Sequence, residues 1–285
     1  MDISVITPFY RGNAYMERLV SCIRRAAEAA PALEVELILV NDSPGCPIEL
    51  SPDWVRGFSV QILDNPQNLG IHGTRLHGLS HARGTFVLFL DQDDVIDPQT
   101  FASQYALSED CDVVLGNGYN ENAGAPIYAS LAHQRAATIL RYYYAVGCMI
   151  VSPGQCLIRR EAIPRAWRER CLRHNGADDL FLWLLMLHDG CRWAFNPQNL
   201  YTHVDTGGNL SANLEKMIRS CQEVLTHLTQ LGILTPAQAR LAARRFDMRR
   251  SYEGKPAVYK LLAMVRYPDQ TWALLCLKVR KTICR

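Results

Sequence analysis

The stretch NPQNLGIHGTRLHGLSHARGTFVLFLDQDD, residues 65–94, decides the fold. A tight turn at 68–70 leads into a predicted helix over 71–83, and the run at 85–90 is apolar on both faces, as strands in the middle of a parallel sheet are. Four acidic residues follow that strand, namely Asp91, Asp93, Asp94 and Asp97. Because open α/β sheets bind ligands at the carboxyl ends of their strands, the sequence predicts a site at this edge.

The rest of the first 117 residues alternates between β-branched runs and helical patterns, which indicates βαβ units and a parallel sheet. Strands are predicted at 3–7, 36–41, 60–63 and 112–115, and helices after Asn13 and after Pro98. Residues 117–151 are irregular and are a candidate substrate loop. Further on, we expect helices at 161–173 and 178–188, short strands near Trp193 and Leu200, and mostly helices over the last 75 residues.

Length and composition exclude several classes of protein. With 285 residues, 48% hydrophobic and 20% charged, the chain resembles globular proteins of one large or two small domains, not disordered, collagen-like or coiled-coil chains. Apolar stretches such as 180–187 are shorter than the roughly 18 residues that a membrane span needs. No secretory signal follows Met1, so we expect a cytoplasmic protein whose ten scattered cysteines are free thiols.

Charge is distributed unevenly along the chain. Residues 240–285 hold twelve Lys or Arg and three Asp or Glu, whereas the remainder is acidic. The apolar faces of the helices expected there allow two interpretations: docking on an anionic membrane surface, or packing on the body of the protein. Nucleic acid is not an expected partner, because no recognition motif accompanies the charge.

The acidic groups suggest chemistry, although each also has a structural interpretation. Clustered carboxylates after strand 85–90 suit a hard divalent cation that also binds phosphate oxygens, but they could form a solvated turn. Asp178 and Asp179 open an apolar helix; one acid suffices as a cap, which leaves the other available as a general base. His203, near a strand end, is either a metal ligand or a polar edge residue.

Two further residues lie where a nucleotide could bind. Arg75 is on the helix that follows the turn at 68–70, where a helix N-terminus attracts phosphate and an arginine can add a bidentate contact; a surface salt bridge is the alternative. Asp42 directly follows the strand at 36–41. It could accept hydrogen bonds from a base or ribose, or simply form the turn before Ser43.

Taken together, these segments resemble family 2 glycosyltransferases of the GT-A fold over about residues 3–210. Four motifs carry the resemblance in the family's order: SVITPFYRG (4–12), LVNDSP (39–44), the block at 65–94 that ends in a DxD triplet, and GADDLFLWL (176–184). The resemblance implies a Rossmann-like, mostly parallel central sheet flanked by helices. It implies a catalytic domain at 1–210, with a nucleotide-sugar half (1–117) and an acceptor half (118–210), followed by a basic helical extension at 211–285.

The resemblance also implies roles for individual residues. The donor would be bound by Thr7, Pro8, Tyr10, Asp42, Arg75, Asp91 and Gln92. Asp93 would hold Mn²⁺ or Mg²⁺, with His203 as a further metal or diphosphate contact. Asp179 falls at the catalytic base and Asp178 at a position that would help to orient the acceptor. Asn41 and Leu185 depart from the family pattern, which leaves the identity of the donor open.

The implied activity is metal-dependent sugar transfer, with inversion, from a nucleotide sugar, expected to be UDP-linked. The acceptor would be a glycan or lipid-linked glycan in surface polysaccharide or lipopolysaccharide synthesis, reached by peripheral attachment to the cytoplasmic face of the inner membrane. Two alternatives stay open. A sugar-phosphate nucleotidyltransferase would need a Gly-rich, basic N-terminal loop, for which only Arg11 and Gly12 are available, and a non-catalytic scaffold would not need Asp93 and Asp179.

Overall fold

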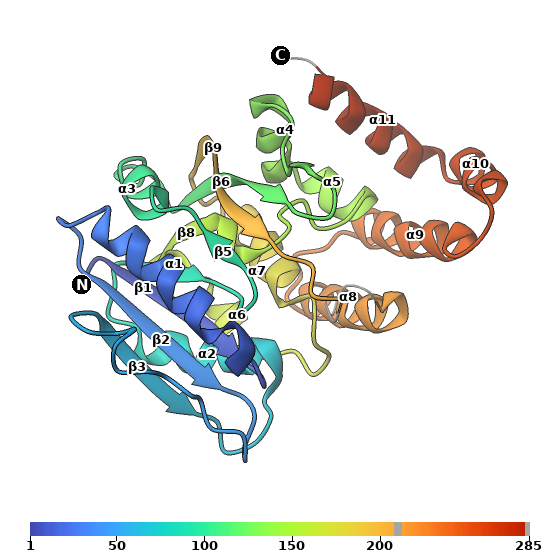
Figure 1. The fold of residues 1–285 in the computed structure, drawn as a ribbon. Coiled ribbons are helices and arrows are strands. Elements are labelled where there is room, and N and C mark those ends of the chain that lie inside the picture. Colours follow the sequence, from blue (N-terminus) through green and yellow to red (C-terminus); the bar gives the residue numbers. More distant parts are fainter. Residues whose placement is uncertain (208–212, 283–285) are drawn as a thin grey trace.

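The computed structural model describes residues 1–207 and 213–282, which form one mixed sheet with helices on both faces and a helical arm (Figure 1). In this part of the chain the sheet has nine strands, in the order β3-β2-β1-β4-β8-β6-β9-β5, with β7 beside β6. The strands are β1 (Ile3–Phe9), β2 (Val35–Asn41), β3 (Ser59–Asp64), β4 (Phe86–Phe89), β5 (Val95–Ile96), β6 (Val113–Asn120), β7 (Ala125–Pro126), β8 (Cys156–Arg159) and β9 (Trp193–His203).

Helices connect these strands and then continue beyond the sheet. They are α1 (Met16–Glu28), α2 (Gly70–His81), α3 (Thr100–Tyr105), α4 (Leu131–Arg135), α5 (Leu140–Ala145), α6 (Arg165–Glu169), α7 (Asp178–His188), α8 (Leu214–Gln230), α9 (Pro236–Tyr252), α10 (Ala257–Arg266) and α11 (Pro268–Thr282). The α/β class and the helical C-terminal segment are confirmed.

The N-terminal half of the sheet follows the sequence pattern closely. β1, β2, β3 and β4 pair in parallel, so their carboxyl ends lie along one edge. Alternate strand residues point to opposite faces. One face packs on α1 and α3, and the other on α2, α6 and α7. The predicted strands at 3–7, 36–41, 60–63, 85–90 and 112–115 and the helix at 71–83 are all confirmed within a few residues.

The second half differs from the expectation in several places. β8 was not predicted, yet it lies antiparallel between β4 and β6. The two short strands expected near Trp193 and Leu200 are one strand, β9, whose pairing with β6 is interrupted by register shifts around Gly116 to Gly118. Such a bulge breaks the alternation by which a strand is recognised. Residues 117–151 are more regular than expected, because β6 runs to Asn120 and α4 and α5 follow.

The helix predicted at 161–173 was also wrong in extent. A 3-10 turn at Arg160–Ala162 is separated from the short α6 by Ile163 and Pro164, both in extended backbone. Proline disfavours helical backbone in the residue before it, so the chain must leave the helix there.

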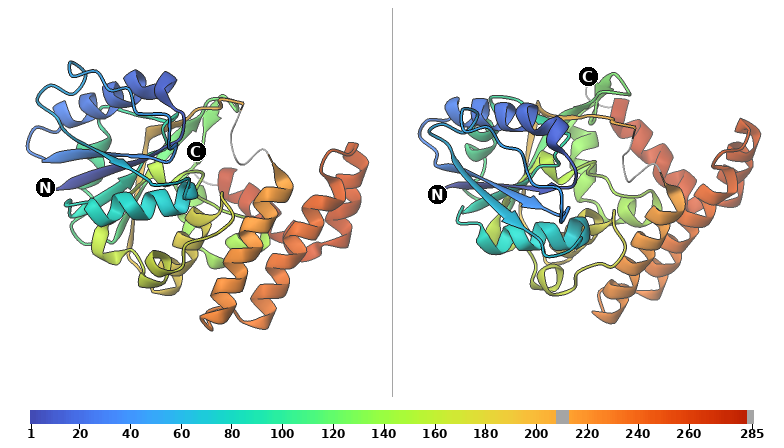
Figure 2. Two further views of the ribbon diagram at one scale, coloured as in Figure 1. Left: turned by 90° about the horizontal axis from the view of Figure 1, so that it is seen from below. Right: turned by 60° about the horizontal axis from the view of Figure 1, so that its bottom comes forward.

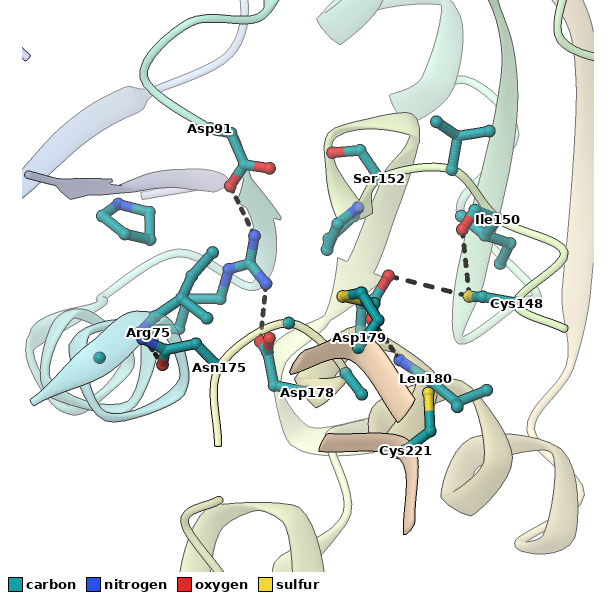
Figure 3. Close-up of a pocket in the computed structure, with 18 of the residues that line it drawn as sticks. Arg75, Asp91, Cys148, Ile150, Ser152, Asn175, Asp178, Asp179, Leu180 and Cys221 are labelled. Atoms are coloured by element: carbon teal, nitrogen blue, oxygen red, sulfur yellow. Dashed lines mark hydrogen bonds and ion pairs between the residues drawn. The ribbon is translucent and has the colours of Figure 1, made fainter. Parts of the chain in front are cut away.

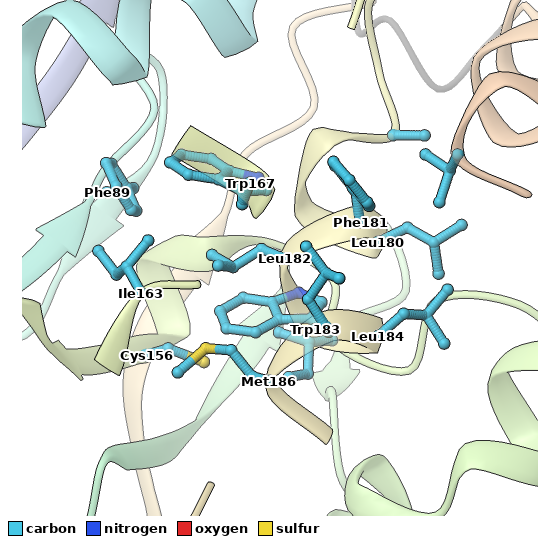
Figure 4. Close-up of a cluster of buried hydrophobic side chains, with 14 of the residues drawn as sticks. Phe89, Cys156, Ile163, Trp167, Leu180, Phe181, Leu182, Trp183, Leu184 and Met186 are labelled. Atoms are coloured by element: carbon cyan, nitrogen blue, oxygen red, sulfur yellow. The ribbon is translucent and has the colours of Figure 1, made fainter. Parts of the chain in front are cut away.

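Helix α7 is apolar on nearly all sides and lies inside the protein. Phe181, Leu182 and Trp183 are at most 1% exposed and pack with Trp167 from α6 and Phe89 from β4 (Figure 4). A helix that is hydrophobic all round belongs in a core. Its packing therefore fixes its N-terminal residues, Asp178 and Asp179, against the edge of the sheet.

Some of the C-terminal helices pack on the body of the protein, which is one of the two interpretations of the basic segment. Ile218, Val224 and Leu228 of α8 and Ala242 and Phe246 of α9 belong to the same core as α7. In two further views α8 and α9 lie side by side, and α10 packs on α9 further from the sheet (Figure 2). The arm returns through α11, whose Ala273 and Leu277 contact Ala136, Tyr142 and Ala145.

Large apolar side chains nevertheless remain on the surface of the last two helices. They are Val258, Tyr259, Leu261, Leu262 and Val265 on α10 and Trp272, Leu274, Leu275 and Val279 on α11. In the described part of the chain no helix combines the length and apolar character of a membrane span. The boundary at 210 lies outside the described residues, so the division into domains stays a prediction.

Candidate active site

A cavity of about 850 Å³ opens where the carboxyl ends of β1, β2 and β4 meet the start of α7 (Figure 3). The loop at 146–153 forms a further wall, and α8 and α9 close the cavity opposite the sheet. The parallel half of the sheet thus presents its strand ends to a space that the C-terminal helices help to enclose.

Arg75 lies beneath this cavity and joins its two sides. Its Nη2 is 2.6 Å from Asp91 Oδ1 and its Nη1 is 2.6 Å from Asp178 Oδ2. Both the Arg75 and the Asp178 side chains are only 3% exposed. Burial alone would lower the pKa of Arg75, but the charges of Asp178 and Asp91 outweigh it and raise that pKa. The arginine is therefore a permanent cation that holds the end of β4 against the start of α7.

The acids after β4 have different environments. Asp94 is buried and accepts hydrogen bonds from the Tyr201 hydroxyl and the Val204 amide, and Asp94 Oδ1 lies 3.2 Å from His203 Nδ1. Burial raises the pKa of Asp91 to about 6 against the opposing effect of Arg75. Asp97 lies outside the cavity, where it is exposed and caps the turn at Gln99.

Asp93 is the carboxylate of this group that suits a divalent cation. Burial, followed by repulsion from Asp94, raises its pKa, and no Lys or Arg side chain in the described residues forms an ion pair with it. A carboxylate on Nδ1, as Asp94 is for His203, is the usual support of a metal-binding imidazole. In the described chain no three His, Cys, Asp or Glu side chains converge as a metal cage. This donor set fits Mn²⁺ or Mg²⁺ held by one or two protein groups together with substrate phosphates.

Asp179 faces the cavity from the first turn of α7. Its Oδ1 accepts a hydrogen bond of 2.6 Å from the Leu180 amide, and the Cys148 thiol donates to its Oδ2 over 3.8 Å. Desolvation by the surrounding protein, and then the charge of Asp178, raise the pKa of Asp179 to about 7. Desolvation also raises the pKa of Cys148, so this thiol is protonated. A carboxylate with a pKa near neutrality is suited to accept a proton.

Of the remaining residues predicted to bind the donor, some line the cavity and one does not. Pro8 and Tyr10 line it. Gln92 also lines it, but its amide is used in two hydrogen bonds with the Tyr10 backbone, at 2.9 and 3.2 Å. Thr7 is fully buried within β1 and does not line the cavity, because β1 is covered on both faces at this point. Its assignment to the nucleotide pocket has no support from this geometry.

Asp42 and Asp178 line the cavity, but their carboxylates already interact with other groups of the protein. Asp42 is 4% exposed and accepts hydrogen bonds from the Leu69 and Gly70 amides and from Asn65. It thereby fixes the turn that starts α2. Asp178 is held by Arg75, as described above. Base recognition by Asp42 and acceptor positioning by Asp178 both remain predictions.

The sequence did not point to the contribution of the C-terminal helices. Met217 and Cys221 from α8 and Arg245, Phe246 and Arg249 from α9 line the cavity. Helical periodicity identified the helices, but it could not tell which face would meet the sheet edge. Cys148 was likewise missed, since a single cysteine in an irregular segment carries no spacing signal.

Known proteins share both this sequence pattern and this architecture. The profile of glycosyl transferase family 2 matches residues 4–167. The chain belongs to this family. The Bacillus subtilis minor teichoic acid biosynthesis protein GgaB is 31% identical over 35% of this chain and 11% of its own length. The pre-mycofactocin glycosyltransferase of Mycobacterium tuberculosis strain H37Rv is 26% identical over 71% of this chain and 42% of its own length.

Solved structures with the GT-A fold resemble the whole chain. S. aureus TarS 1-349 in complex with UDP-GlcNAc has a TM-score of 0.62 and 17% identity, over 95% of this chain and 81% of that one. The Pyrobaculum calidifontis mannosyltransferase PcManGT in complex with GDP-Man and Mn²⁺ has a TM-score of 0.55 and 14% identity, over 99% and 86%. The GT-A fold predicted from the family 2 motifs is therefore confirmed. The chain spans less than half the length of the curated relatives that it matches.

The Arg75 bridge predicts a large stability effect at Asp178. In Asp178→Asn the buried guanidinium loses one of its two counter-charges, and breaking a buried ion pair from one side costs about 3–5 kcal/mol. Urea unfolding of wild type and variant measures this loss.

Asp53→Asn is the matched control. It removes the exposed Arg56–Asp53 pair, which has the same 2.6 Å separation but side chains 82% and 78% exposed. We expect little change there, because solvent screens surface pairs. Equal losses in the two variants would contradict the structural role of Asp178.

Proposed function

We propose that this family 2 protein transfers a sugar from a nucleotide sugar, UDP-linked, to a hydroxyl group of a glycan acceptor, with inversion and with the help of a divalent metal ion. The observation that carries the proposal is the position of Asp179, a carboxylate with a pKa near neutrality, in the same cavity as the carboxylates of Asp91 and Asp93. One group is suited to activate an acceptor and the others to a diphosphate with its cation. TarS binds UDP-GlcNAc and PcManGT binds GDP-Man with Mn²⁺, which supports this class of donor.

The donor would lie along the strand ends, with its nucleotide near Pro8 and Tyr10 and its diphosphate near Asp93. Asp93 and His203 would hold Mn²⁺ or Mg²⁺, which supplies charge compensation for the departing diphosphate. Arg75 has a supporting role in this arrangement, because its guanidinium is buried behind Asp91 and fixes that carboxylate.

The acceptor hydroxyl would give its proton to Asp179. Asp178, the adjacent acid, forms an ion pair with Arg75, whereas Asp179 has no cationic side chain in an ion pair within the described residues. The two neighbouring acids are therefore set to different tasks by their surroundings. The attacking oxygen displaces the nucleoside diphosphate from the opposite side of the anomeric carbon, so the configuration inverts and no covalent enzyme intermediate is needed.

The proposed cellular role is supported by the helical arm. Basic residues, among them Lys260, Arg266 and Lys278, accompany the exposed apolar side chains of α10 and α11. That combination suits an interfacial contact with anionic lipid. We propose peripheral attachment to the cytoplasmic face of the inner membrane and a lipid-linked acceptor in polysaccharide or lipopolysaccharide synthesis. The teichoic acid name of GgaB supports a surface glycan.

The two alternatives receive less support. A nucleotidyltransferase would have no use for Asp179 at the start of α7. A scaffold would not need to keep a half-buried carboxylate with a raised pKa open to a cavity, since such groups are concentrated at catalytic sites.

A donor screen tests the proposal directly. Purified protein is incubated with Mn²⁺ and, in turn, with UDP-, GDP- and dTDP-sugars, and released nucleoside diphosphate is measured. We expect slow hydrolysis of one UDP-sugar that EDTA stops and Asp93→Ala reduces by about a hundredfold or more. No release, combined with no thermal shift by any nucleotide, would reject a transferase.

Asp179→Asn should abolish turnover without impairing folding or donor binding. Turnover of the wild type should rise with pH through about 7, as Asp179 loses its proton, and the variant should be nearly inactive with unchanged affinity for UDP. Because the pKa is raised in the folded state, the acid destabilises the fold increasingly between its unfolded pKa of about 4 and its folded pKa of about 7, a penalty that asparagine avoids. Thermal unfolding should therefore show a larger gain for the variant at pH 8 than at pH 5. A gain that is equal at both pH values would contradict the raised pKa.

Vesicle co-sedimentation at low salt tests the membrane contact. The wild type should bind vesicles rich in anionic lipid and not neutral ones. Replacing Leu261 and Val265, which are 63% and 82% exposed, by Asn should weaken binding more than tenfold, through about 1 kcal/mol or more per side chain. Ile62→Asn on β3, 41% exposed, is the control. Wild-type protein that ignores anionic vesicles would refute this contact.

A further inference from the structure

The cavity contains an arginine with no acidic partner. Arg245, from α9, lines the cavity, and within residues 1–207 and 213–282 no Asp or Glu forms an ion pair with it. The segments outside that range, 208–212 and 283–285, contain no Asp or Glu in their sequence. A cation enclosed by protein is costly unless it is paired, so its counter-charge is expected to come from a ligand.

Packing holds Arg245 in one position. Its Nη1 donates to the Tyr143 carbonyl near the end of α5, and its guanidinium carbon lies 4.4 Å from the centre of the Phe246 ring. An arginine has five N–H donors. The Tyr143 carbonyl and the Cys221 thiol use only part of these donors, and Arg245 lines the cavity, so donors remain for a ligand that enters it.

Arg245 lies at the acceptor end of the cavity. A Cβ at Gly147 would lie 3.9 Å from Arg245 Nη1, and the thiol of the next residue, Cys148, contacts Asp179. The arginine is thus on the side of the cavity where Cys148 contacts the proposed base, whereas Asp93 belongs to the segment that follows β4.

A second arginine and an apolar lining strengthen this region. Arg249, one helical turn further on α9, lines the same cavity, and its only ion pair in the described chain is a 3.3 Å contact with Glu253 in which both side chains are about half exposed. Met217, Ile218 and Phe246 line the cavity next to them. Such apolar surroundings increase the attraction between a guanidinium and an anion.

A structural role alone explains only part of this arrangement. An arginine at the end of α5 can satisfy a terminal carbonyl and interact with the helix dipole. That role accounts for the bond to Tyr143. It does not account for the remaining donors of Arg245, or for Arg249, which within the described residues has a hydrogen bond to Glu253 and none to α5.

We propose that Arg245 and Arg249 form an anion-binding subsite for the acceptor, and that the acceptor carries a phosphate group near the hydroxyl that receives the sugar. Guanidinium groups bind phosphate oxygens in a planar, bidentate manner. The proposal rests on the proposed function, because it places the phosphate beside Asp179 as the base. It gives the cavity a cation-binding end for the donor and an anion-binding end for the acceptor.

Inorganic phosphate is the probe that tests the subsite. The full chain is first saturated with UDP and Mn²⁺, so that phosphate cannot occupy the donor end, and calorimetry then measures phosphate binding at constant ionic strength. Arg245→Gln should weaken binding by about tenfold or more, the loss of one charge-assisted contact. Arg240→Gln, an exposed arginine on the same helix that does not line the cavity, should bind as the wild type does. Phosphate binding that survives Arg245→Gln, or that Arg240→Gln reduces equally, would overturn the proposal.

Two further variants separate recognition from packing. Arg249→Gln leaves the bond to Tyr143 intact, and it should weaken phosphate binding several-fold without changing the unfolding temperature. Arg245→Lys keeps the charge, and it should restore part of the binding lost in Arg245→Gln. If Arg245→Gln is destabilised while Arg249→Gln binds phosphate normally, Arg245 is only a helix cap and the subsite is rejected.

The same data distinguish this proposal from the proposed function. Failure of the transferase proposal would appear as a wild-type chain that no nucleotide stabilises, and phosphate binding can then be measured without UDP. Failure of the subsite would appear as nucleotide binding with no phosphate binding that depends on Arg245. Transfer to phosphorylated but not to dephosphorylated glycan acceptors would support both proposals together.

Discussion

The ion pairs of Arg75 with Asp91 and Asp178 are the interaction on which the site depends. They join residues that are 16 and 103 positions apart in the chain: a helix of the nucleotide half, the end of the central strand, and the start of α7. Without the guanidinium, the edge of the sheet would present several carboxylates to one another in a poorly hydrated space. Repulsion among them would then oppose the packing of α7. The arginine is thus the reason that so many acids can be gathered there.

This bridge also explains why adjacent acids differ. Asp178 is neutralised by Arg75 and is buried, whereas Asp179 faces the cavity with a backbone amide and a neutral thiol as its contacts. Burial without a counter-charge favours the protonated form of Asp179, and the negative charge of Asp178 adds to that preference. In the proposed mechanism, Asp179 can act as a general base because it lacks the cationic partner that Asp178 has in Arg75.

The sequence predicted the parts of the site that local patterns encode. Apolar strands ending in acids located Asp91, Asp93 and Asp94 at the sheet edge, and the paired acids at the start of an apolar helix located Asp179. It could not predict that Arg75 would be buried between Asp91 and Asp178, because no periodicity connects partners 103 residues apart. β8 was missed because its four residues are too few for a pattern, and β9 was split because a bulge interrupts its alternation. Thr7 was assigned to the nucleotide pocket from its motif, but it is buried within β1, and burial depends on tertiary packing that the motif does not encode.

The C-terminal helices show why composition alone left their role open. Their basic, amphipathic sequence was compatible with packing on the protein or with docking on a membrane. In the structure, α8 and α9 contribute apolar residues and two arginines to the cavity, whereas α10 and α11 keep large apolar side chains on the surface. α9 packs against both α5 and α10, so the arm connects the cavity wall to the exposed surface. An acceptor with an anionic group and a lipid anchor would match both ends of this arm. Under the two proposals, the extension would form part of the acceptor site.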